Sequence, residues 1–186
     1  MPNVGAKCSK TSRRLEVKAA LPESVEIREV GPRDGLQNET TIPVKERIAL
    51  IDALSGTGLA AIEAASFVHP NAIPPMAGSA EVMKGITRVP GVRYRALVPN
   101  ERGALDALEC DADEIEVVMS ISETHNHKNI NMSPDESVRQ IIELTDLAHQ
   151  KETPVEAILS TAFGCAYEGD IAPDRVAHYA RRVLDE

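Results

Sequence analysis

Short apolar segments alternate with segments of helical spacing along most of this chain, and this alternation restricts the possible folds more than any other feature of the sequence. Five apolar runs have the length of a strand: 25–30, 60–67, 93–99, 115–121 and 155–162. Between them, apolar residues recur every three or four positions, as in 44–54 and 138–147. Strands that alternate with helices predict a parallel sheet built from crossover units.

The number of units leaves two architectures open. The chain offers about five β/α units, whereas a closed β/α barrel has eight, in typically about 250 residues. The chain is therefore either an open, doubly wound five-stranded sheet or the front part of a barrel. The strand pattern alone does not decide between them.

Helix start and stop signals place several elements. Ser133, Pro134 and Glu136 form an N-cap, a proline in the first turn and a capping-box glutamate, which predicts a helix that begins at 134. A helix is also expected from Pro43 to Gly56, and others over 80–86, 101–108 and 173–184. The polar segment SETHNHKNINMS, residues 122–133, is predicted to be a loop.

Composition argues against several classes of protein. The 186 residues carry a net charge of -9 and contain 3% aromatic residues and no Trp. An acidic chain without stacking residues does not suit nucleic acid, and the sequence has no uncharged apolar run long enough to span a bilayer. Cys8, Cys110 and Cys165 are odd in number and far apart, which argues against a disulfide framework or a structural zinc site.

The first residues differ from the rest of the chain. Residues 1–22 are basic, and no apolar segment of a secretory signal follows them. We expect a flexible tail there, followed by one domain over residues 23–186, and a cytoplasmic protein. An organellar transit peptide, with the mitochondrial matrix as the compartment, is the alternative.

The stretch VEIREVGPRDGLQNE, residues 25–39, is the strongest candidate for a functional segment. It is expected to be a strand that leads into a Gly-Pro-Arg-Asp-Gly turn, and chemistry in α/β folds lies at the carboxyl ends of strands. Arg33 and Asp34 place a cation beside a carboxylate, which suits a site that holds an oxyanion and a divalent metal. A solvent-exposed turn without function would also use these residue types.

The string GPRDGLQNE after a short strand resembles the signature of the 3-hydroxy-3-methylglutaryl-CoA lyase family, within a wider group of metal-dependent lyases and acyl-CoA condensing enzymes. Three further segments are similar to segments of that family: 61–86, 122–133 and 160–173. The segments are distributed along nearly all of residues 25–186. The resemblance implies that the chain is the front five β/α units of a truncated TIM (β/α)8 barrel.

The resemblance also implies a reaction. It is the cleavage of 3-hydroxy-3-methylglutaryl-CoA, an acyl-CoA, to acetoacetate and acetyl-CoA, with Mg²⁺ or Mn²⁺ as cofactor. This retro-Claisen reaction removes a proton from a tertiary hydroxyl and forms a thioester enolate, so it needs a base, a fixed cation and a metal. By family likeness, Asp34 is a metal ligand, and Arg33 is the catalytic and substrate-binding cation that stabilises the enolate oxygen.

Further residues are implied by the same likeness. Glu63 corresponds to a catalytic acidic position, and a lone carboxylate inside an apolar strand is costly unless it is paired. Glu29 is a supporting acidic residue of the same pocket or part of a structural ion pair. Gln37, Ser66 and Asn129 correspond to substrate-binding positions, Asn129 on the CoA side.

Two other features are interpreted as structural. His125 and His127 have a spacing that binds metals on a strand, because alternate residues share a face. They lie in the expected loop 122–133, away from the position of the family's metal-binding histidines, and are therefore predicted not to bind the metal. Cys165 is expected to pack structurally, since the catalytic cysteine of the family lies later in the sequence.

The sequence departs from the family in ways that leave alternatives open. The family's remaining metal ligands and its catalytic cysteine would follow Glu186, so we expect this chain to be an inactive fragment. Its unpaired edge strand is expected to favour association, with a homo-oligomer as one form. Residues 69–73 and Ala166 also differ from the usual family sequences. The alternatives are a lyase for a related 3-hydroxy-3-acyl-CoA, a condensing acyl-CoA synthase of the same group, and a non-catalytic α/β binding domain.

Overall fold

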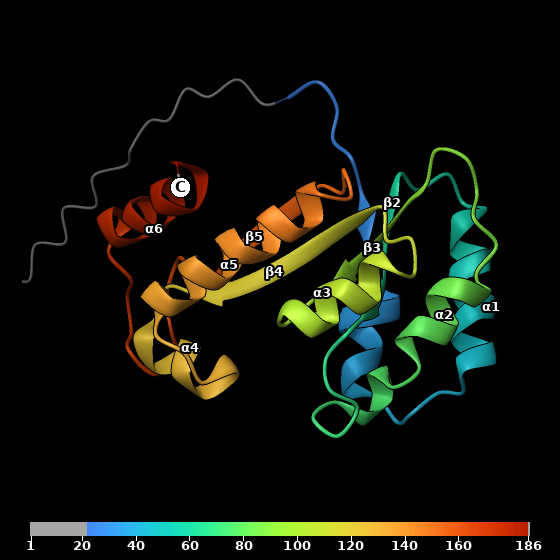
Figure 1. Cartoon of the computed structure of the whole chain (residues 1–186), viewed down its shortest axis with the longest axis horizontal. Coiled ribbons are helices and arrows are strands. Elements are labelled where there is room, and N and C mark those ends of the chain that lie inside the picture. The colour runs from blue at the N-terminus through green and yellow to red at the C-terminus, as the bar shows by residue number, and fades with distance from the viewer. Residues whose placement is uncertain (1–21, 186) are drawn as a thin grey trace, which may run out of the picture.

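A parallel sheet of five strands organises the part of the chain that the computed structural model describes, residues 22–185 (Figure 1). The strands are β1 (Arg28–Glu29), β2 (Ala61–Ser66), β3 (Arg93–Leu97), β4 (Glu114–Ser120) and β5 (Val155–Ser160). They pair in the order of the sequence, β1-β2-β3-β4-β5, and each pair is parallel. A doubly wound sheet would reverse this order, so the open alternative is wrong and the barrel arc is confirmed.

The sheet curls strongly across its width. Nη1 of Arg28 on β1 lies 2.6 Å from Oε2 of Glu156 on β5, although three strands separate β1 from β5. In a flat sheet the two strands would be about 19 Å apart. The five units therefore form a half-barrel whose concave face is lined by the side chains of Arg28 and Glu156.

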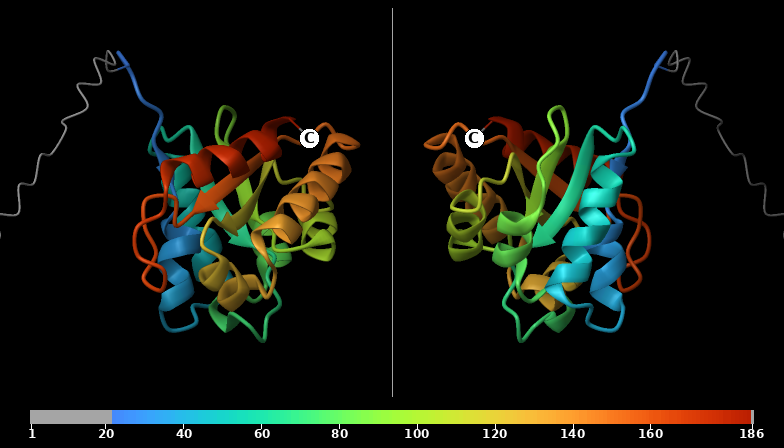
Figure 2. Two further views of the ribbon diagram at one scale, coloured as in Figure 1. Left: turned by 90° about the vertical axis from the view of Figure 1, so that its left-hand side faces the viewer. Right: turned by 90° about the vertical axis from the view of Figure 1, so that its right-hand side faces the viewer.

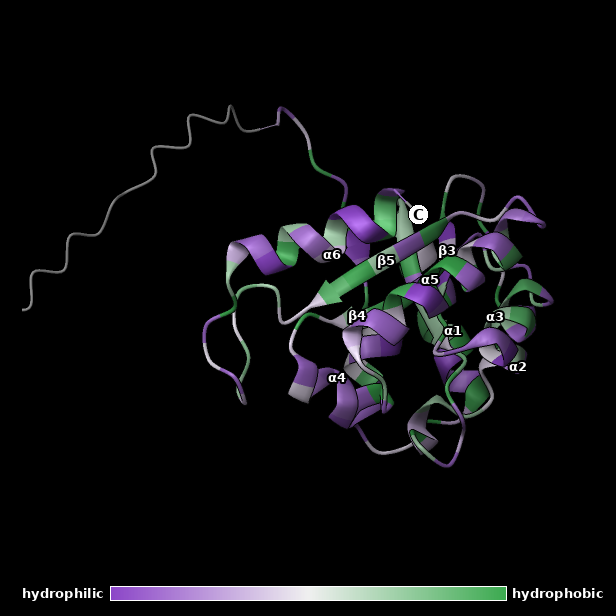
Figure 3. Cartoon of the chain, turned by 60° about the vertical axis from the view of Figure 1, so that its left-hand side comes forward, coloured by the Kyte–Doolittle hydropathy of each residue, from purple (hydrophilic) through white to green (hydrophobic). Residues whose placement is uncertain are grey.

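Helices cover the convex face of the half-barrel (Figure 2). They are α1 (Val44–Ser55), α2 (Ser79–Gly85), α3 (Glu101–Leu108), α5 (Pro134–His149) and α6 (Pro173–Asp185). Their surfaces carry alternating hydrophilic and hydrophobic bands (Figure 3), as amphipathic helices on a sheet should. The apolar bands and the outer faces of β2, β3 and β4 enclose the main core.

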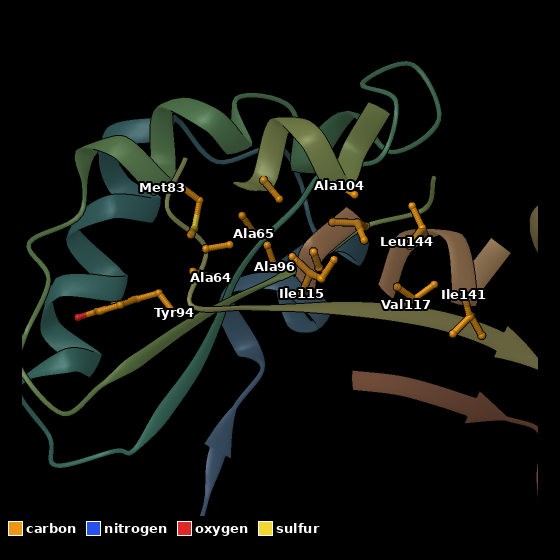
Figure 4. Close-up of a cluster of buried hydrophobic side chains, with 14 of the residues drawn as sticks. Ala64, Ala65, Met83, Tyr94, Ala96, Ala104, Ile115, Val117, Ile141 and Leu144 are labelled. Atoms are coloured by element: carbon orange, nitrogen blue, oxygen red, sulfur yellow. The ribbon is translucent and has the colours of Figure 1, made fainter. Parts of the chain in front are cut away.

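The core contains many small residues, which lets the helices approach the sheet closely. Ala64, Ala65 and Ala96 are fully buried among Ile115 and Met83 (Figure 4). The side chain of Tyr94 reaches between α1 and α2, where its hydroxyl donates to Oγ of Ser55 at 2.8 Å. The core lies between the sheet and the helices, and the concave face is left to polar side chains.

Most predicted elements are confirmed, and the capping box is present as expected. The backbone nitrogen of Glu136 donates to Oγ of Ser133 at 3.2 Å, and the backbone nitrogen of Ser133 donates to Oε2 of Glu136 at 2.7 Å. Helix α3 has the bounds expected from the sequence. The expected tail, residues 1–22, lies outside the described residues except for Pro22.

The first strand is much shorter than the predicted run 25–30. Strand β2 begins at Ala61, which pairs with Arg28, so the residues before Arg28 extend beyond the end of their partner. Val25 and Ile27 are 77% and 66% exposed for this reason. The expectation that both would lie in the first strand was wrong.

The segment 122–133 is also not the loop that was predicted. It contains the helix α4 (Glu123–Ile130), whose N-cap Ser122 accepts a hydrogen bond from the backbone nitrogen of His125 at 3.1 Å. Asn131 ends it in the left-handed conformation at φ 56°. The buried Asn126 ties α4 to its surroundings, because it accepts from the backbone of Ser120 and donates to Ser137, both at 2.7 Å.

Short helical turns follow the first two strands. The Gly-Pro-Arg-Asp-Gly segment forms one turn of π-helix, η1 (Gly31–Gly35), and continues into a 3₁₀ turn, η2 (Leu36–Asn38). A second 3₁₀ turn, η3 (Pro74–Met76), lies after β2. Single π-turns occur often at functional sites, so the first segment stays the leading candidate. Within residues 22–185, no helix is both long and apolar enough to cross a membrane.

Candidate functional site at the carboxyl ends of the strands

The carboxyl ends of the strands meet at one end of the half-barrel. In Figure 2 the arrowheads of the strands point to the end at which η1 and α4 lie. The loop after β5, residues 161–172, joins this end, because Oε1 of Glu168 accepts a hydrogen bond from the backbone nitrogen of Thr124 at 2.6 Å. Residues from the first, second, fourth and fifth units thus surround the same end of the sheet.

Arg33 is held by two carboxylates at this end. Its Nε donates to Oε1 of Glu63 at 2.5 Å, and its Nη1 donates to Oδ1 of Asp34 at 2.9 Å. The side chain of Arg33 is 13% exposed, and that of Glu63 is 2% exposed. The third nitrogen, Nη2, takes part in neither pair. A guanidinium group that carboxylates hold in place through some of its nitrogens can bind an oxyanion through the remaining one.

Asp34 faces solvent and is shared between two donors. Besides Arg33, the side chain of Gln37 donates to Oδ1 of Asp34 at 2.8 Å, from Nε2. The Asp34 side chain is 54% exposed, and its second oxygen, Oδ2, takes no part in these bonds. The predicted neighbours Arg33, Asp34, Gln37 and Glu63 therefore form one hydrogen-bonded group.

Glu29 supports the turn rather than the guanidinium. Its Oε1 accepts a hydrogen bond from the backbone nitrogen of Gly31 at 2.6 Å, which fixes the start of η1. It lies just before the turn, and it forms no ion pair in the described part of the chain. The structural ion pair considered for this residue is thus replaced by a bond to the backbone.

The other two predicted residues are not joined to the group around Arg33. Ser66 ends β2, is 1% exposed, and its Oγ has no hydrogen-bond partner among residues 22–185. Asn129 is exposed on α4, which follows β4, two strands further along the sheet than β2. Both lie at the carboxyl end of the sheet.

The comparisons with known proteins agree with this geometry. The sequence model of the HMGL-like family matches residues 24–185. The chain belongs to the HMGL-like family. Hydroxymethylglutaryl-CoA lyase YngG of Bacillus subtilis is 47% identical over 165 residues, which cover 88% of this chain and 55% of that protein. A Pseudomonas aeruginosa protein named 3-hydroxy-3-isohexenylglutaryl-CoA/hydroxy-methylglutaryl-CoA lyase is 45% identical, covering 88% of this chain and 55% of that protein.

Solved structures of this family share the fold. The crystal structure of the B. subtilis HMG-CoA lyase aligns with a TM-score of 0.86 at 47% identity, covering 88% of this chain and 55% of that one. An HMG-CoA lyase from Acinetobacter baumannii, solved with coenzyme A and 3-methylmalate, aligns with a TM-score of 0.82 at 40% identity, covering 86% and 52%. The HMGL-like chain described here spans about half the length of the relatives it matches.

Proteins of the HMGL-like family generally depend on a divalent metal. No group of three or more His, Cys, Asp or Glu side chains that could hold a metal occurs among residues 22–185. Asp34 supplies one exposed carboxylate, whereas a divalent cation takes several oxygen or nitrogen ligands. The described residues therefore offer a single candidate ligand and do not complete a metal site.

The two histidines face different neighbours because they lie on a helix. Residues two apart on a helix do not share a face. His125 Nδ1 lies 2.7 Å from Oγ of Ser120, and His127 Nε2 lies 3.3 Å from Oε1 of Glu123. Their placement in a loop was wrong, and the helix gives a further reason against joint metal binding.

Cys165 is buried against the N-cap of α4. Its Sγ lies 3.0 Å from Oγ of Ser122, and the backbone nitrogen of Tyr167 donates to Sγ at 3.3 Å. Burial by itself raises the pKa of the Cys165 thiol, but its hydrogen bond with Ser122 and those from the backbones of Tyr167 and Glu168 outweigh it and lower the pKa. These contacts agree with a packing role, in which Cys165 joins the loop after β5 to α4.

The sequence reasoning missed a group of charged residues on the concave face. This interior charge cluster consists of Arg28, Arg95, Glu114, Glu116 and Glu156. A signal was present, because Glu114 and Glu116 alternate with apolar residues at the start of β4 and must therefore share a face. Which charges meet across the barrel depends on strand order and register, which the sequence does not show.

Proposed function

We propose that this chain supplies the front half of the barrel of a 3-hydroxy-3-methylglutaryl-CoA lyase, a carbon–carbon lyase that acts on an acyl-CoA. The observation that carries the proposal is the Arg33–Glu63 pair beside Asp34, at the carboxyl end of the sheet in an HMGL-like chain. Relatives that bear this name are about 45% identical along most of the chain. A structure of one of them contains coenzyme A.

The proposed reaction is a retro-Claisen cleavage. A base removes the proton of the tertiary hydroxyl of 3-hydroxy-3-methylglutaryl-CoA, a carbonyl forms at that carbon, and the bond to the thioester-bearing methylene breaks. The electron pair of that bond goes to the thioester, which becomes an enolate and is then protonated to acetyl-CoA. The other product is acetoacetate. Arg33 stabilises the enolate oxygen through the edge of its guanidinium that Glu63 leaves open.

Each of the remaining site residues has a place in this proposal. Glu63 fixes the guanidinium from the barrel interior and so counts among the catalytic machinery. Glu29 fixes η1 through the backbone of Gly31. Gln37 and the buried hydroxyl of Ser66 line the acyl part of the substrate, and Asn129 on α4 lies on the CoA side.

Asp34 is the proposed protein ligand of the divalent metal, Mg²⁺ or Mn²⁺. It is exposed, and its Oδ2 is outside the bonds to Arg33 and Gln37. A bound divalent ion would polarise the substrate oxygens. Since the described residues do not complete the metal's ligand set, the chain by itself is expected to be inactive.

The alternatives differ in what they require. A lyase for a related 3-hydroxy-3-acyl-CoA is favoured by one observation, the isohexenylglutaryl-CoA name of a relative at 45% identity. A condensing synthase of the same group and a non-catalytic binding domain have no such observation. We propose a cytoplasmic protein with the mitochondrial matrix as the alternative, because relatives of both compartments are similar. We propose no nucleic-acid or membrane partner, and self-association through the open edge of β5 as a further property.

The release of acetoacetate from 3-hydroxy-3-methylglutaryl-CoA, with Mg²⁺ or Mn²⁺ added, tests the proposal. The 186-residue chain is compared with a longer form, in which residues 22–185 are followed by the second half of the B. subtilis relative. Activity is expected in the longer form only and should fall by at least about a thousandfold in Asp34→Asn and Arg33→Met, typical of losing a metal ligand or an oxyanion donor. The matched control is Asp146→Asn, on the far side of α5.

Two results would contradict the proposal. Full activity of the longer form with Asp34→Asn would exclude Asp34 as a ligand. A longer form that binds the metal but cleaves neither this substrate nor longer 3-hydroxy-3-acyl-CoA thioesters would exclude the lyase.

A further inference from the structure

Glu116 is the most deeply buried carboxyl of the interior charge cluster. It lies on β4 and faces the concave side of the sheet, and its side chain is 0% exposed. Its Oε1 accepts a hydrogen bond from Nη1 of Arg28 at 3.1 Å and lies 3.0 Å from Nε of Arg95. Two guanidinium groups therefore approach the same oxygen.

The second oxygen of Glu116 has a different environment. Oε2 is fully buried and accepts no hydrogen bond from any residue that the structure describes. A buried carboxylate oxygen without a donor is costly, because it has lost its water and gained no partner. The neighbour of this carboxyl group is the carboxyl group of Glu63, which is within hydrogen-bonding reach.

The charges around Glu116 do not balance when every group is ionised. Arg28 and Arg95 are each paired with carboxylates of this cluster, which are Glu114, Glu116 and Glu156. Three carboxylates thus surround two guanidinium groups. The charge of Glu63 is balanced by Arg33, so this ion pair leaves no positive charge to offset the third carboxylate. One additional proton would make the interior neutral.

A proton on Oε2 of Glu116 resolves both observations. It converts an acceptor without a donor into a donor, and it removes the excess negative charge. Its acceptor is the carboxylate of Glu63, whose Oε1 accepts a hydrogen bond from Nε of Arg33 at 2.5 Å. The result is a continuous series of hydrogen bonds from Glu116 on β4 through Glu63 on β2 to Arg33 in η1.

We propose that Glu116 is a positioning residue for the active site. It keeps a proton on Oε2 and donates a hydrogen bond from it to Glu63, and this bond fixes Glu63 in the orientation that binds Arg33. The positioning role rests on the function proposed above for Arg33, whereas the protonation of Glu116 does not depend on it. Among residues 22–185, Arg33 is bound by Glu63 and Asp34 and has no ion pair with Glu116, so the effect of Glu116 passes through Glu63.

The electrostatics of the pair support this assignment. Burial, the hydrogen bond to Glu63 and the negative charge of Glu63 raise the pKa of Glu116 to about 9. Arg28 on β1 lowers this pKa, and Glu156 on β5 raises it. Arg95 on β3 and Glu114 on β4 are the other charged groups that face the cluster. Near neutral pH, Glu116 is thus the member that keeps its proton.

The test reads the carboxyl group and Arg33 directly, in the 186-residue chain and without substrate. With ¹³C-labelled glutamate, the side-chain carboxyl of Glu116 is expected to titrate near pH 9, against about 4.3 for an ordinary glutamate. Its signal is assigned by its loss in Glu116→Gln. With ¹⁵N-labelled arginine, the Nε–H signal of Arg33 is followed over the same range and assigned by its loss in Arg33→Lys.

The expected results separate positioning from a merely structural role. In the unsubstituted chain the Arg33 signal should shift in step with the ionisation of Glu116. Glu116→Gln keeps a donor toward Glu63, so the signal should stay as it is at pH 7 and lose its dependence on pH up to 10. Glu116→Ala should speed the exchange of the Arg33 Nε–H with water about tenfold, the effect of losing one hydrogen bond. The matched control is Glu114→Gln, on the same face and also bound to Arg95 but not to Glu63, and it should leave the Arg33 signal unchanged.

Two results would overturn the proposal. A Glu116 carboxyl that titrates near pH 4 would show that it holds no proton at neutral pH. An Arg33 signal that does not respond to Glu116 ionisation, or that changes equally in Glu116→Gln and Glu116→Ala, would show that Glu116 does not position Arg33. Absence of lyase activity would leave both readouts unaffected, so it would count against the proposed function and not against this assignment.

Discussion

Oε1 of Glu29 lies 2.6 Å from the backbone nitrogen of Gly31 and accepts its hydrogen bond at the start of η1. A β-carbon at residue 31 would lie 2.7 Å from the same oxygen, a separation that β-carbons essentially never show. A side chain at residue 31 would therefore have to displace the carboxylate at the far end of the flexible Glu29 side chain. The bond between Glu29 and Gly31 ties the end of β1 to the turn that carries Arg33.

We expect Gly31→Ala to destabilise the chain. The added methyl group must displace the Glu29 carboxylate and so breaks its hydrogen bond with the backbone nitrogen of Gly31, a loss of about 0.5–1.5 kcal/mol. Urea unfolding measures the change in the free energy of unfolding. Gly35→Ala is the control in the same turn, because nothing lies within 4 Å of its β-carbon and its φ of -64° is helical. Equal losses in both variants would contradict the explanation.

The ion pair of Arg28 with Glu156 gives a second prediction. Arg28 also donates to the fully buried Glu116, so Arg28→Met would leave two carboxylates with one guanidinium fewer. Because Arg28 is about one third exposed, we expect a loss of about 1–3 kcal/mol, less than for a fully buried pair. Urea unfolding measures this loss. An experiment at high salt should reproduce most of it, since the partner Glu116 is shielded from solvent.

The control for this prediction is Arg102→Met. Arg102 is 84% exposed and pairs with Asp106 one helical turn away, an arrangement that contributes about 0.5 kcal/mol or less. A loss at Arg28 no larger than the loss at Arg102 would mean that the interior charge cluster does not hold the curled sheet together.

Elements whose signals are local could be predicted from the sequence. Helix α5 begins where Ser133, Pro134 and Glu136 indicate, because a capping box acts within four residues. Strand β1 was predicted too long, because its true extent is set by where β2 begins. Helix α4 was missed, although Ser122 and Asn131 are good start and stop residues, because its segment has few apolar residues and is fixed instead by the buried Asn126.

In the candidate site, too, local contacts could be predicted from the sequence and long-range contacts could not. Arg33, Asp34 and Gln37 are close in the sequence, and their hydrogen bonds follow from one helical turn. The bond from Arg33 to Glu63 joins residues 30 apart, and only the family resemblance indicated it. Glu116 was not foreseen, since its neighbours Arg28, Glu63 and Glu156 come from three other strands whose register the sequence does not reveal.

The N-caps of α4 and α5 should differ in their contribution to stability. Ser133→Ala removes an exposed cap and should cost about 1 kcal/mol. Ser122 is 0% exposed, and it holds the backbone of His125 while Cys165 lies against the same oxygen. Ser122→Ala should therefore cost more, about 2 kcal/mol, because a buried donor is left without its acceptor. Urea unfolding of both variants checks the order, and a larger loss at Ser133 would contradict it.

The pH dependence of stability follows from the raised pKa of Glu116. Between the unfolded pKa of about 4.3 and the folded pKa of about 9, the native state binds a proton that the unfolded state has released. The contribution is fully present below the lower value, falls as the pH rises, and is gone above the higher value. We expect the free energy of unfolding to decrease from pH 6 to pH 9 by up to about 1.4 kcal/mol per unit. Burial and Glu156 also raise the pKa of Glu114, so Glu114 contributes a loss of the same sign above its unfolded pKa.

Glu116→Gln isolates the contribution of Glu116 to this slope. The amide keeps the shape and a donor toward Glu63 but has no proton to lose. The decrease in the free energy of unfolding above pH 6 should therefore become smaller by the contribution of one bound proton. Glu136 and Glu168 do not interfere, because hydrogen bonds from the backbones of Ser133 and Thr124 lower their pKa values, and their effect is confined to acid pH. Urea unfolding at several pH values from 5 to 9 checks both chains. An identical slope in both would mean that Glu116 is ionised throughout, and the interior of the half-barrel would then carry three carboxylates against two guanidinium groups.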